Sequence, residues 1–86
     1  MAKPANVAEV RWTRNARGFY LDLNQRQREL VGRQAGYLEQ FPLLGQRDRS
    51  GNDRRLLGVR RLGILYEYQP EADLVTIISI RPLGLQ

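Results

Sequence analysis

The clearest periodicity in the chain is an apolar stripe in residues 25–41, which recurs at the spacing of an amphipathic helix. Its members are Leu30, Val31, Ala35, Leu38 and Phe41. Asn24 is a favourable N-cap, and Pro42 should end the helix at or just before Phe41, because a residue before proline avoids the α region. A shorter helix is predicted over residues 16–23, with Thr13 or Asn15 as its cap.

The other apolar residues fall in short β-rich runs. The predicted strands are residues 7–12, 54–60, 62–68 and 74–80, with a turn at 69–73 and Pro82 ending the last strand. In that last run, positions 76, 78 and 80 alternate with 75, 77 and 79, so one of these two sets should pack on the helices. The predicted fold is α+β in the order β-α-α-β-β-β. A helical layer covers a three-stranded antiparallel sheet, which the N-terminal strand joins at an edge.

The length of 86 residues predicts one small domain, residues 1–86. Residues 1–6 are expected to be a flexible leader, residues 44–53 a mobile charged loop and residues 82–86 a tail. No cysteine or histidine is present, which excludes disulfides, thiolate zinc sites and Ser-His catalysis, so we expect no cofactor and no metal. No apolar run approaches the ~20 residues that cross a bilayer, and the N-terminus lacks the apolar core of a signal peptide. We therefore expect a cytoplasmic protein without membrane contact.

Charge adds a preference for anionic partners. The chain carries 14 basic and 9 acidic residues, a net charge of +5, and Lys3 is its only lysine. Arginine matches phosphate bidentately, so this composition favours nucleic acid or an acidic protein as partner. A G+C-rich genome would also explain the preference for arginine codons, although it explains the positive sum less well.

Most of the excess charge lies in residues 45–61, which hold six arginines and two acids. These arginines are Arg47, Arg49, Arg54, Arg55, Arg60 and Arg61. In an extended strand Arg55 and Arg61 would share one face, and Arg54 and Arg60 the other. This cluster predicts a surface for phosphate or an acidic partner, and the alternative is solvated charge that protects a sheet edge.

Three further features are open to a functional or a structural interpretation. Tyr66 and Tyr68 are either strand aromatics or, for Tyr68, a proton-carrying phenol. Arg81, at the end of the last strand, is either a contact to a target or an ordinary strand-end charge. The aliphatic residues exceed what one small core buries, which predicts a patch for a partner protein or a homodimer. The residues in question are Leu56, Leu57, Leu62, Leu83 and Leu85.

Several segments together resemble the RelE/ParE superfamily of bacterial toxins. The first is the turn "FP-x-LG", matched by Phe41, Pro42, Leu44 and Gly45. The second is the strand pair, matched by Arg55, Leu57, Val59, Arg61, Ile64, Leu65 and Tyr66. The third is the last strand, matched by Val75, Ile77, Ile78 and Ile80. Residues 9–16 resemble the opening strand and helix start of the family.

The resemblance implies the toxin of a type II toxin–antitoxin pair, a class tied to growth arrest and plasmid stabilization, with a cognate antitoxin as partner. ParE-like members of the family inhibit DNA gyrase. RelE-like members bind RNA on the ribosome and cut mRNA without a metal ion, using arginines, lysines and a tyrosine or histidine near the C-terminus. For the gyrase activity, the target-binding residues would be Arg47, Arg49, Arg55 and Arg60. For an mRNA endonuclease, the catalytic residues would be Arg54, Arg61, Arg81 and Tyr68.

The sequence departs from the ribonuclease pattern at positions that carry its charge. One basic position falls on Leu56, and a tyrosine–arginine pair falls on Leu62 and Gly63. After Ile80 the six remaining residues contain neither tyrosine nor histidine. The sequence therefore favours a ParE-like gyrase inhibitor over an mRNA endonuclease. A nontoxic adaptor that binds nucleic acid or protein on the same fold is the third possibility.

Overall fold

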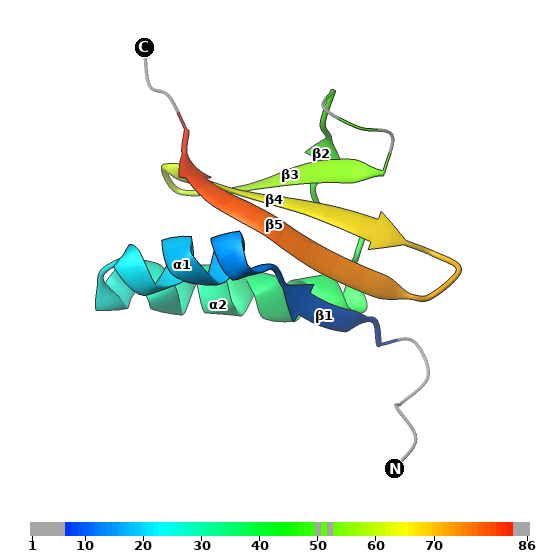
Figure 1. Cartoon of the computed structure of the whole chain (residues 1–86), viewed down its shortest axis with the longest axis horizontal. Helices are drawn as coiled ribbons and strands as arrows, with labels where there is room; N and C mark the ends of the chain where they lie inside the picture. The colour runs from blue at the N-terminus through cyan, green and yellow to red at the C-terminus, as the bar shows by residue number, and fades with distance from the viewer. Residues whose placement is uncertain (1–6, 50, 52, 84–86) are drawn as a thin grey trace.

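The computed structural model describes residues 7–49, 51 and 53–83. The strands are β1 (Glu9–Trp12), β2 (Gln46–Arg47), β3 (Arg54–Val59), β4 (Leu62–Gln69) and β5 (Leu74–Pro82), and the helices are α1 (Arg14–Asp22) and α2 (Gln25–Gln40) (Figure 1). The sheet order is β1-β5-β4-β3-β2, in which β1 runs parallel to β5 and the other neighbours are antiparallel. The predicted α+β class and the edge position of the first strand are confirmed.

One strand lies where the sequence predicts only a mobile loop. Within residues 44–53, β2 pairs with the start of β3, with Gln46 opposite Leu56 and Arg47 opposite Arg55. Both β2 residues are exposed, so backbone pairing rather than side-chain burial places this strand. The loop therefore supplies the edge of the sheet, as Figure 1 shows.

Both helices begin at side chains that satisfy free backbone N–H groups. Asn24 Oδ1 accepts a hydrogen bond from Gln27 N at 2.8 Å, and Gln27 Oε1 accepts one from Asn24 N at 3.1 Å, which together form a capping box. Thr13 Oγ1 accepts from Ala16 N at 3.1 Å and donates to Ile78 O at 2.9 Å. Thr13 therefore caps α1 and ties its start to β5.

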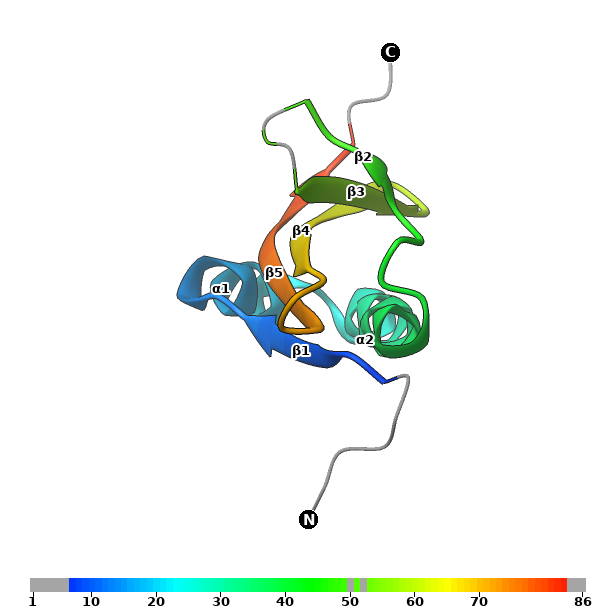
Figure 2. The same ribbon diagram turned by 90° about the vertical axis from the view of Figure 1, so that its right-hand side faces the viewer.

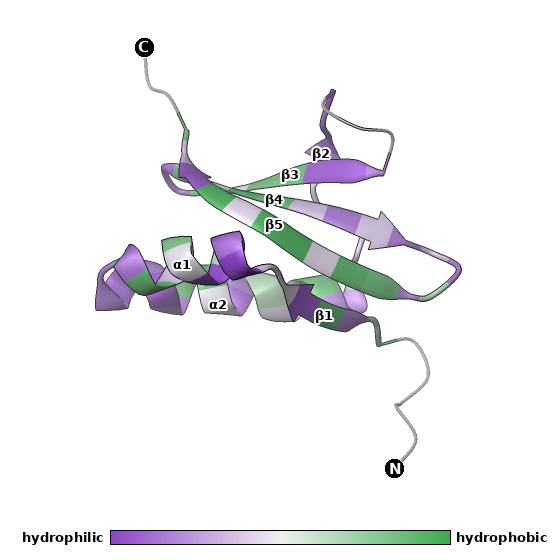
Figure 3. Cartoon of the chain, viewed as in Figure 1, coloured by the Kyte–Doolittle hydropathy of each residue, from purple (hydrophilic) through white to green (hydrophobic). Residues whose placement is uncertain are grey.

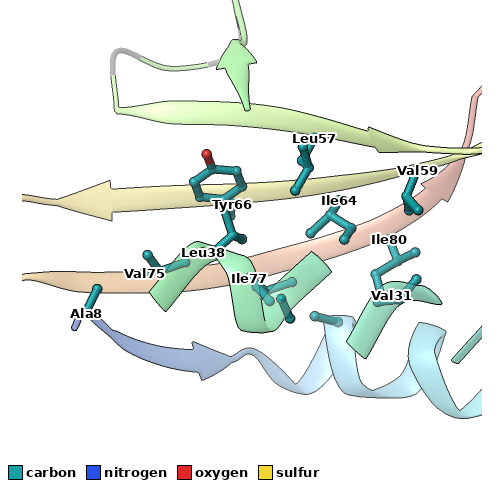
Figure 4. Close-up of a cluster of buried hydrophobic side chains, with 12 residues drawn as sticks. Ala8, Val31, Leu38, Leu57, Val59, Ile64, Tyr66, Val75, Ile77 and Ile80 are labelled. Carbon is teal, nitrogen blue, oxygen red and sulfur yellow. The ribbon is translucent and has the colours of Figure 1, made fainter. Parts of the chain in front are cut away.

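The core lies between α2 and the inner face of the sheet (Figures 2 and 4). Its buried members are Ala8, Ala16, Val31, Ala35, Leu38, Leu57, Val59, Ile64, Tyr66, Val75, Ile77 and Ile80. The predicted helical stripe is confirmed except at Phe41, whose side chain is 57% exposed. Phe41 is the C-cap of α2, with φ −131°, so the chain has already left the helical path that would turn this side chain inward.

A β-bulge in β5 changes which residues face the core. Tyr66 pairs with Ile77, and the preceding residue Leu65 pairs with Ser79, so Ile78 is the extra residue. The alternation expected over residues 75–80 is therefore wrong in its second half. Ile77 and Ile80 both point into the core, because the bulge shifts the pleat by one position.

The hydroxyl of the buried Tyr66 fixes the turn that follows α2. It donates to Pro42 O and accepts from Gly45 N, both at 2.8 Å. A Cβ on Gly45 would lie 2.9 Å from the Tyr66 ring and 3.0 Å from the Leu56 backbone, so only glycine fits this close approach. Burial raises the pKa of Tyr66, and the Gly45 hydrogen bond and the Arg55 charge oppose that rise in part.

The exposed apolar residues are not the ones predicted. Leu57 is buried, Leu56, Leu62 and Leu83 are half-buried, and Leu85 lies outside the described residues. The large apolar side chains that are exposed are instead Phe19, Leu21, Tyr37, Phe41, Leu43 and Leu44. In the described part of the chain, neither helix has the length and apolar character that a membrane span requires.

Candidate functional site

The sheet face that points away from the core, called here the outer face, brings together residues from β3, β4 and β5. Cross-strand register places its side chains in rows, because directly paired residues share a face. The rows are Arg54–Glu67–Thr76, Leu56–Leu65–Ser79 and Gly58–Gly63–Arg81. Of the four residues that the sequence proposes for ribonuclease catalysis, Arg54 and Arg81 lie on this face.

The first row of the outer face carries an ion pair. Arg54 Nε lies 3.1 Å from Glu67 Oε1, and both side chains are about one-third exposed, at 35% and 34%. An anion that approached Arg54 would have to displace the Glu67 carboxylate or accept its repulsion. The Nε–H of Arg54 is therefore engaged by Glu67 within the sheet.

The third row is almost flat, because two of its residues are glycines. Leu83 lies over this row, and its backbone N donates to Arg61 O at 2.7 Å. A Cβ on Gly63 would come within 2.9 Å of Leu83 Cδ2 and 3.0 Å of Leu56 Cδ1, whereas one on Gly58 would lie 3.5 Å from Leu83 Cδ1. The apolar side chain of Leu83 therefore fills the space above Gly63, where the resemblance places an arginine.

Ser79, in the central row, has a buried hydroxyl oxygen with no hydrogen-bond partner among the described residues. Its cross-strand neighbour Leu65 is 3% exposed, so the centre of the outer face is apolar around this one polar atom. Glu67 is the one carboxylate in these three rows, and it is already paired with Arg54.

The hairpin between β3 and β4 carries the next two arginines. The strand ends at Val59, so Arg60 and Arg61 form the turn, and the expectation that they continue the alternation of an extended strand is wrong. Arg60 has φ 57°, a left-handed backbone conformation that is rare for residues other than glycine, asparagine and aspartate. Both arginines are exposed at the rim of the sheet, in a turn that Figure 3 colours as hydrophilic.

The remaining candidates are not brought to the outer face. Arg55 points to the core side, where its Nη1 donates to Gly45 O at 2.8 Å and Leu43 O at 3.4 Å. Tyr68 shares a row with Val75 on that same side, and its hydroxyl donates to Asp73 Oδ1 at 2.9 Å. The sheet therefore separates Tyr68 from Arg54 and Arg81.

The surroundings of Tyr68 keep its phenol protonated. The hydrogen bond to the Asp73 carboxylate, helped by partial burial and by the charges of Asp73 and Glu71, raises the pKa of Tyr68 above its ordinary value.

Arg47 lies exposed in the edge strand β2, and Arg49 lies exposed just beyond it. In the described ranges, no group of histidine, cysteine or acidic side chains is arranged to hold a metal ion.

The sequence interpretation missed two features of this site. It treated Leu83 as tail and gave Glu67 no role, because neither residue is close in the chain to its contact partner. The strand register carried the only available signal, since it places Glu67 opposite Arg54. The position of Leu83 depends on the path of the chain after β5 and has no local sequence signal.

No family model matches this sequence, and the comparison with curated proteins finds no match. Solved structures do match. A chain of the RelBE2 toxin–antitoxin complex of Mycobacterium tuberculosis is 25% identical, with a TM-score of 0.80 over 88% of this chain and 98% of that chain. The isolated RelE toxin of Escherichia coli is 16% identical, with a TM-score of 0.81 over 92% of this chain and 87% of that chain.

The same architecture extends to the other branch of these toxins. A chain of the chromosomal ParDE system of Pseudomonas aeruginosa is 12% identical, with a TM-score of 0.71 over 93% of this chain and 100% of that chain. This chain therefore has the fold of the RelE and ParE toxins. Within the RelE/ParE fold, its outer face combines a paired Arg54, an apolar centre and one exposed arginine, Arg81.

Proposed function

We propose that this protein is the toxin of a type II toxin–antitoxin pair, which arrests growth by binding an essential target and is held inactive by a cognate antitoxin. The observation that carries the proposal is the likeness to RelE and ParE chains over at least 88% of this chain. The net charge of +5 supports an acidic partner or an anionic target.

The composition of the outer face favours binding of a target over cleavage of RNA. Cleavage by a 2′-hydroxyl needs cations on the phosphate and groups that move a proton. Here Arg54 is paired with Glu67, Leu83 covers Gly63, and the phenol of Tyr68 lies on the other side of the sheet. DNA gyrase inhibition is therefore the favoured activity, with contacts from Arg81 and the hairpin arginines Arg60 and Arg61.

A ribosome-dependent mRNA endonuclease is the second candidate. It is favoured by the shared outer-face position of Arg54 and Arg81 and by the TM-score of 0.81 with the RelE toxin. For this activity the Arg54–Glu67 pair would have to open when RNA binds, so that Arg54 could contact the phosphate.

Two assays on the purified chain test the proposal against the alternative. Primer extension on mRNA from a translating extract detects cleavage, and a supercoiling assay detects gyrase inhibition. We expect inhibited supercoiling without new mRNA ends. New codon-positioned ends would replace the gyrase proposal with the endonuclease, and harmless overexpression with neither effect would overturn the toxin role in favour of an adaptor.

Paired charge reversals locate the surface. Arg81→Glu should abolish growth arrest, because it removes the exposed cation of the outer face. Arg33→Glu is the matched control, since it reverses another exposed arginine, which lies on α2 and not on the sheet. Equal toxicity of the two variants would show that the outer face is not the contact surface.

A further inference from the structure

A hollow of about 240 Å³ lies between the start of α2 and the β3–β4 hairpin. These two segments lie at the same end of the molecule (Figure 1). The lining residues come from both segments and are Asn24, Arg26, Gln27, Leu30, Val59, Arg60, Arg61 and Leu62. The hollow lies on the core side of the sheet, across the hairpin from the outer face, because Val59 and Leu62 pair in the row that follows Leu57 and Ile64.

The side chains around this hollow offer donors and no carboxylate. Arg26, Arg60 and Arg61 are exposed and form no ion pair within the described part of the chain. The first turn of α2 contains no acidic residue. All charged residues that line the hollow are therefore cationic.

The capping box extends this set of donors. Asn24 and Gln27 each use the amide oxygen to accept a hydrogen bond from the other residue's backbone. Each side chain therefore keeps its NH₂ group, which is only a donor. The residues that line the hollow therefore include three arginines, two side-chain amides and the apolar residues Leu30, Val59 and Leu62.

The backbone of the hairpin is held in an unfavourable conformation at this place. Arg60 adopts φ 57° at a turn position where glycine is the usual residue. A long cationic side chain here retains backbone strain that glycine would remove, and such strain is concentrated at functional sites. This observation is independent of the charge of the hollow.

We propose that this hollow binds a phosphodiester of single-stranded nucleic acid, with the phosphate on the three arginines and the attached base against the apolar lining residues. Arginine forks match phosphate oxygens bidentately. Bases of single strands stack on arginine planes and apolar surfaces, whereas a duplex does not expose them. The apolar residues beside the arginines offer a surface to the attached base, a group that an acidic peptide lacks, which favours nucleic acid over an acidic peptide.

The site shares Arg60 and Arg61 with the proposed gyrase contact, but it goes beyond that activity, because its other residues lie on the core side of the sheet and it needs no catalytic group. The hairpin is the rim that both surfaces share, since Arg61 O accepts from Leu83 N, and Leu83 covers the outer face. Arg81 pairs across the sheet with Gly63, next to the hairpin. A single strand that is bound in the hollow would therefore pass close to Arg81 where it exits.

Fluorescence anisotropy with a labelled oligouridylate tests the proposal. The test variant carries Arg26→Gln, Arg60→Gly and Arg61→Gln. The control variant carries Arg14→Gln, Arg17→Gln and Arg33→Gln, which removes the same charge from exposed helix positions. We expect the test variant to lose about tenfold or more in affinity, and the control to lose much less, because only the former removes charge-assisted contacts.

Salt dependence adds a second readout. Between about 50 and 200 mM salt, the slope of log K against log salt should become shallower by about 0.7 in the test variant, because the site neutralises one phosphate of a single strand. Circular dichroism confirms that both variants are folded. Equal losses in the two variants would show general charge attraction and overturn the site.

Two further outcomes separate the proposal from its alternatives. Polyglutamate that competes as strongly as the oligonucleotide for the native chain, and not for the test variant, would replace the nucleic acid with an acidic peptide. A chain that binds the oligonucleotide through the hollow but fails to arrest growth leaves the site intact and refutes only the toxin role. A toxic chain whose oligonucleotide binding is unchanged in the test variant refutes only the site.

Discussion

Removing the hydroxyl of Tyr66 isolates the contribution of one buried oxygen to the fold. In Tyr66→Phe, Gly45 N loses its acceptor and Pro42 O loses its donor, each from a bond of 2.8 Å. Gly45 is buried, so its unpaired N–H costs about 1–3 kcal/mol, whereas the half-buried Pro42 carbonyl reaches water and loses about 0.5–1.5 kcal/mol. We expect a total loss of about 2–3 kcal/mol in the free energy of unfolding.

This loss is large for a chain of 86 residues, because domains of this size have little stability to spare. At about 4–8 °C per kcal/mol, it lowers the Tm by roughly 10–20 °C. Urea unfolding followed by circular dichroism measures the change, and Tyr37→Phe is the matched control, because the Tyr37 side chain is 46% exposed. Hydrogen exchange at the Gly45 amide should accelerate in Tyr66→Phe. If Tyr66→Phe unfolds at the same urea concentration as Tyr37→Phe, the assignment of stability to this hydroxyl is wrong.

Three other predictions follow from the geometry. Burial raises the pKa of Tyr66 above 10.0. The protonated phenol therefore stabilises the fold fully below pH 10, and this contribution is lost as the pH rises through the folded pKa. The fall in Tm at alkaline pH should accordingly be smaller in Tyr66→Phe than in the native chain. Arg60→Gly should stabilise the chain by about 0.5–1 kcal/mol in urea unfolding, because it relieves a φ of 57°, and an unchanged or lower stability would contradict the strain. Gly63→Ala should destabilise by about 1–3 kcal/mol, and Leu83→Ala should rescue part of that loss, since the added methyl meets Leu83. Strictly additive effects in this double-mutant cycle would show that the two residues are not in contact.

The helices could be predicted because their signals are local. Asn24 and Gln27 lie three residues apart and form the capping box by themselves, and Pro42 ends α2 whatever surrounds it. The β-rich runs likewise predicted β3, β4 and β5. Each of these predictions depends on neighbours within one turn of helix or a few residues of strand.

The missed features depend on contacts between distant segments. The strand β2 is set by backbone pairing to β3 and by the anchor of Gly45 on Tyr66, 21 residues away. The hollow joins Arg26 to Arg60 and Arg61, whose positions in the chain gave no reason to consider them together. The charge count located the arginine-rich segment, but only the register decided that Arg54 is paired and that Arg55 faces inward.

The bulge at Ile78 shifts the inward and outward alternation of β5 by one residue. Upstream of it the odd-numbered residues Val75 and Ile77 point inward, and downstream the even-numbered Ile80 does so, which leaves Arg81 on the outer face. Loss of Ile78 alone would keep every other β5 residue on its present face, but it would remove the carbonyl that receives Thr13. Residues 74–77 pair with β1. Loss of a residue from 74–76 would instead move side chains of this paired segment to the opposite face of the sheet. Loss of the bulge residue is therefore compatible with the pairing of the sheet, and it removes one of the two hydrogen bonds that hold Thr13, at the start of α1, to β5.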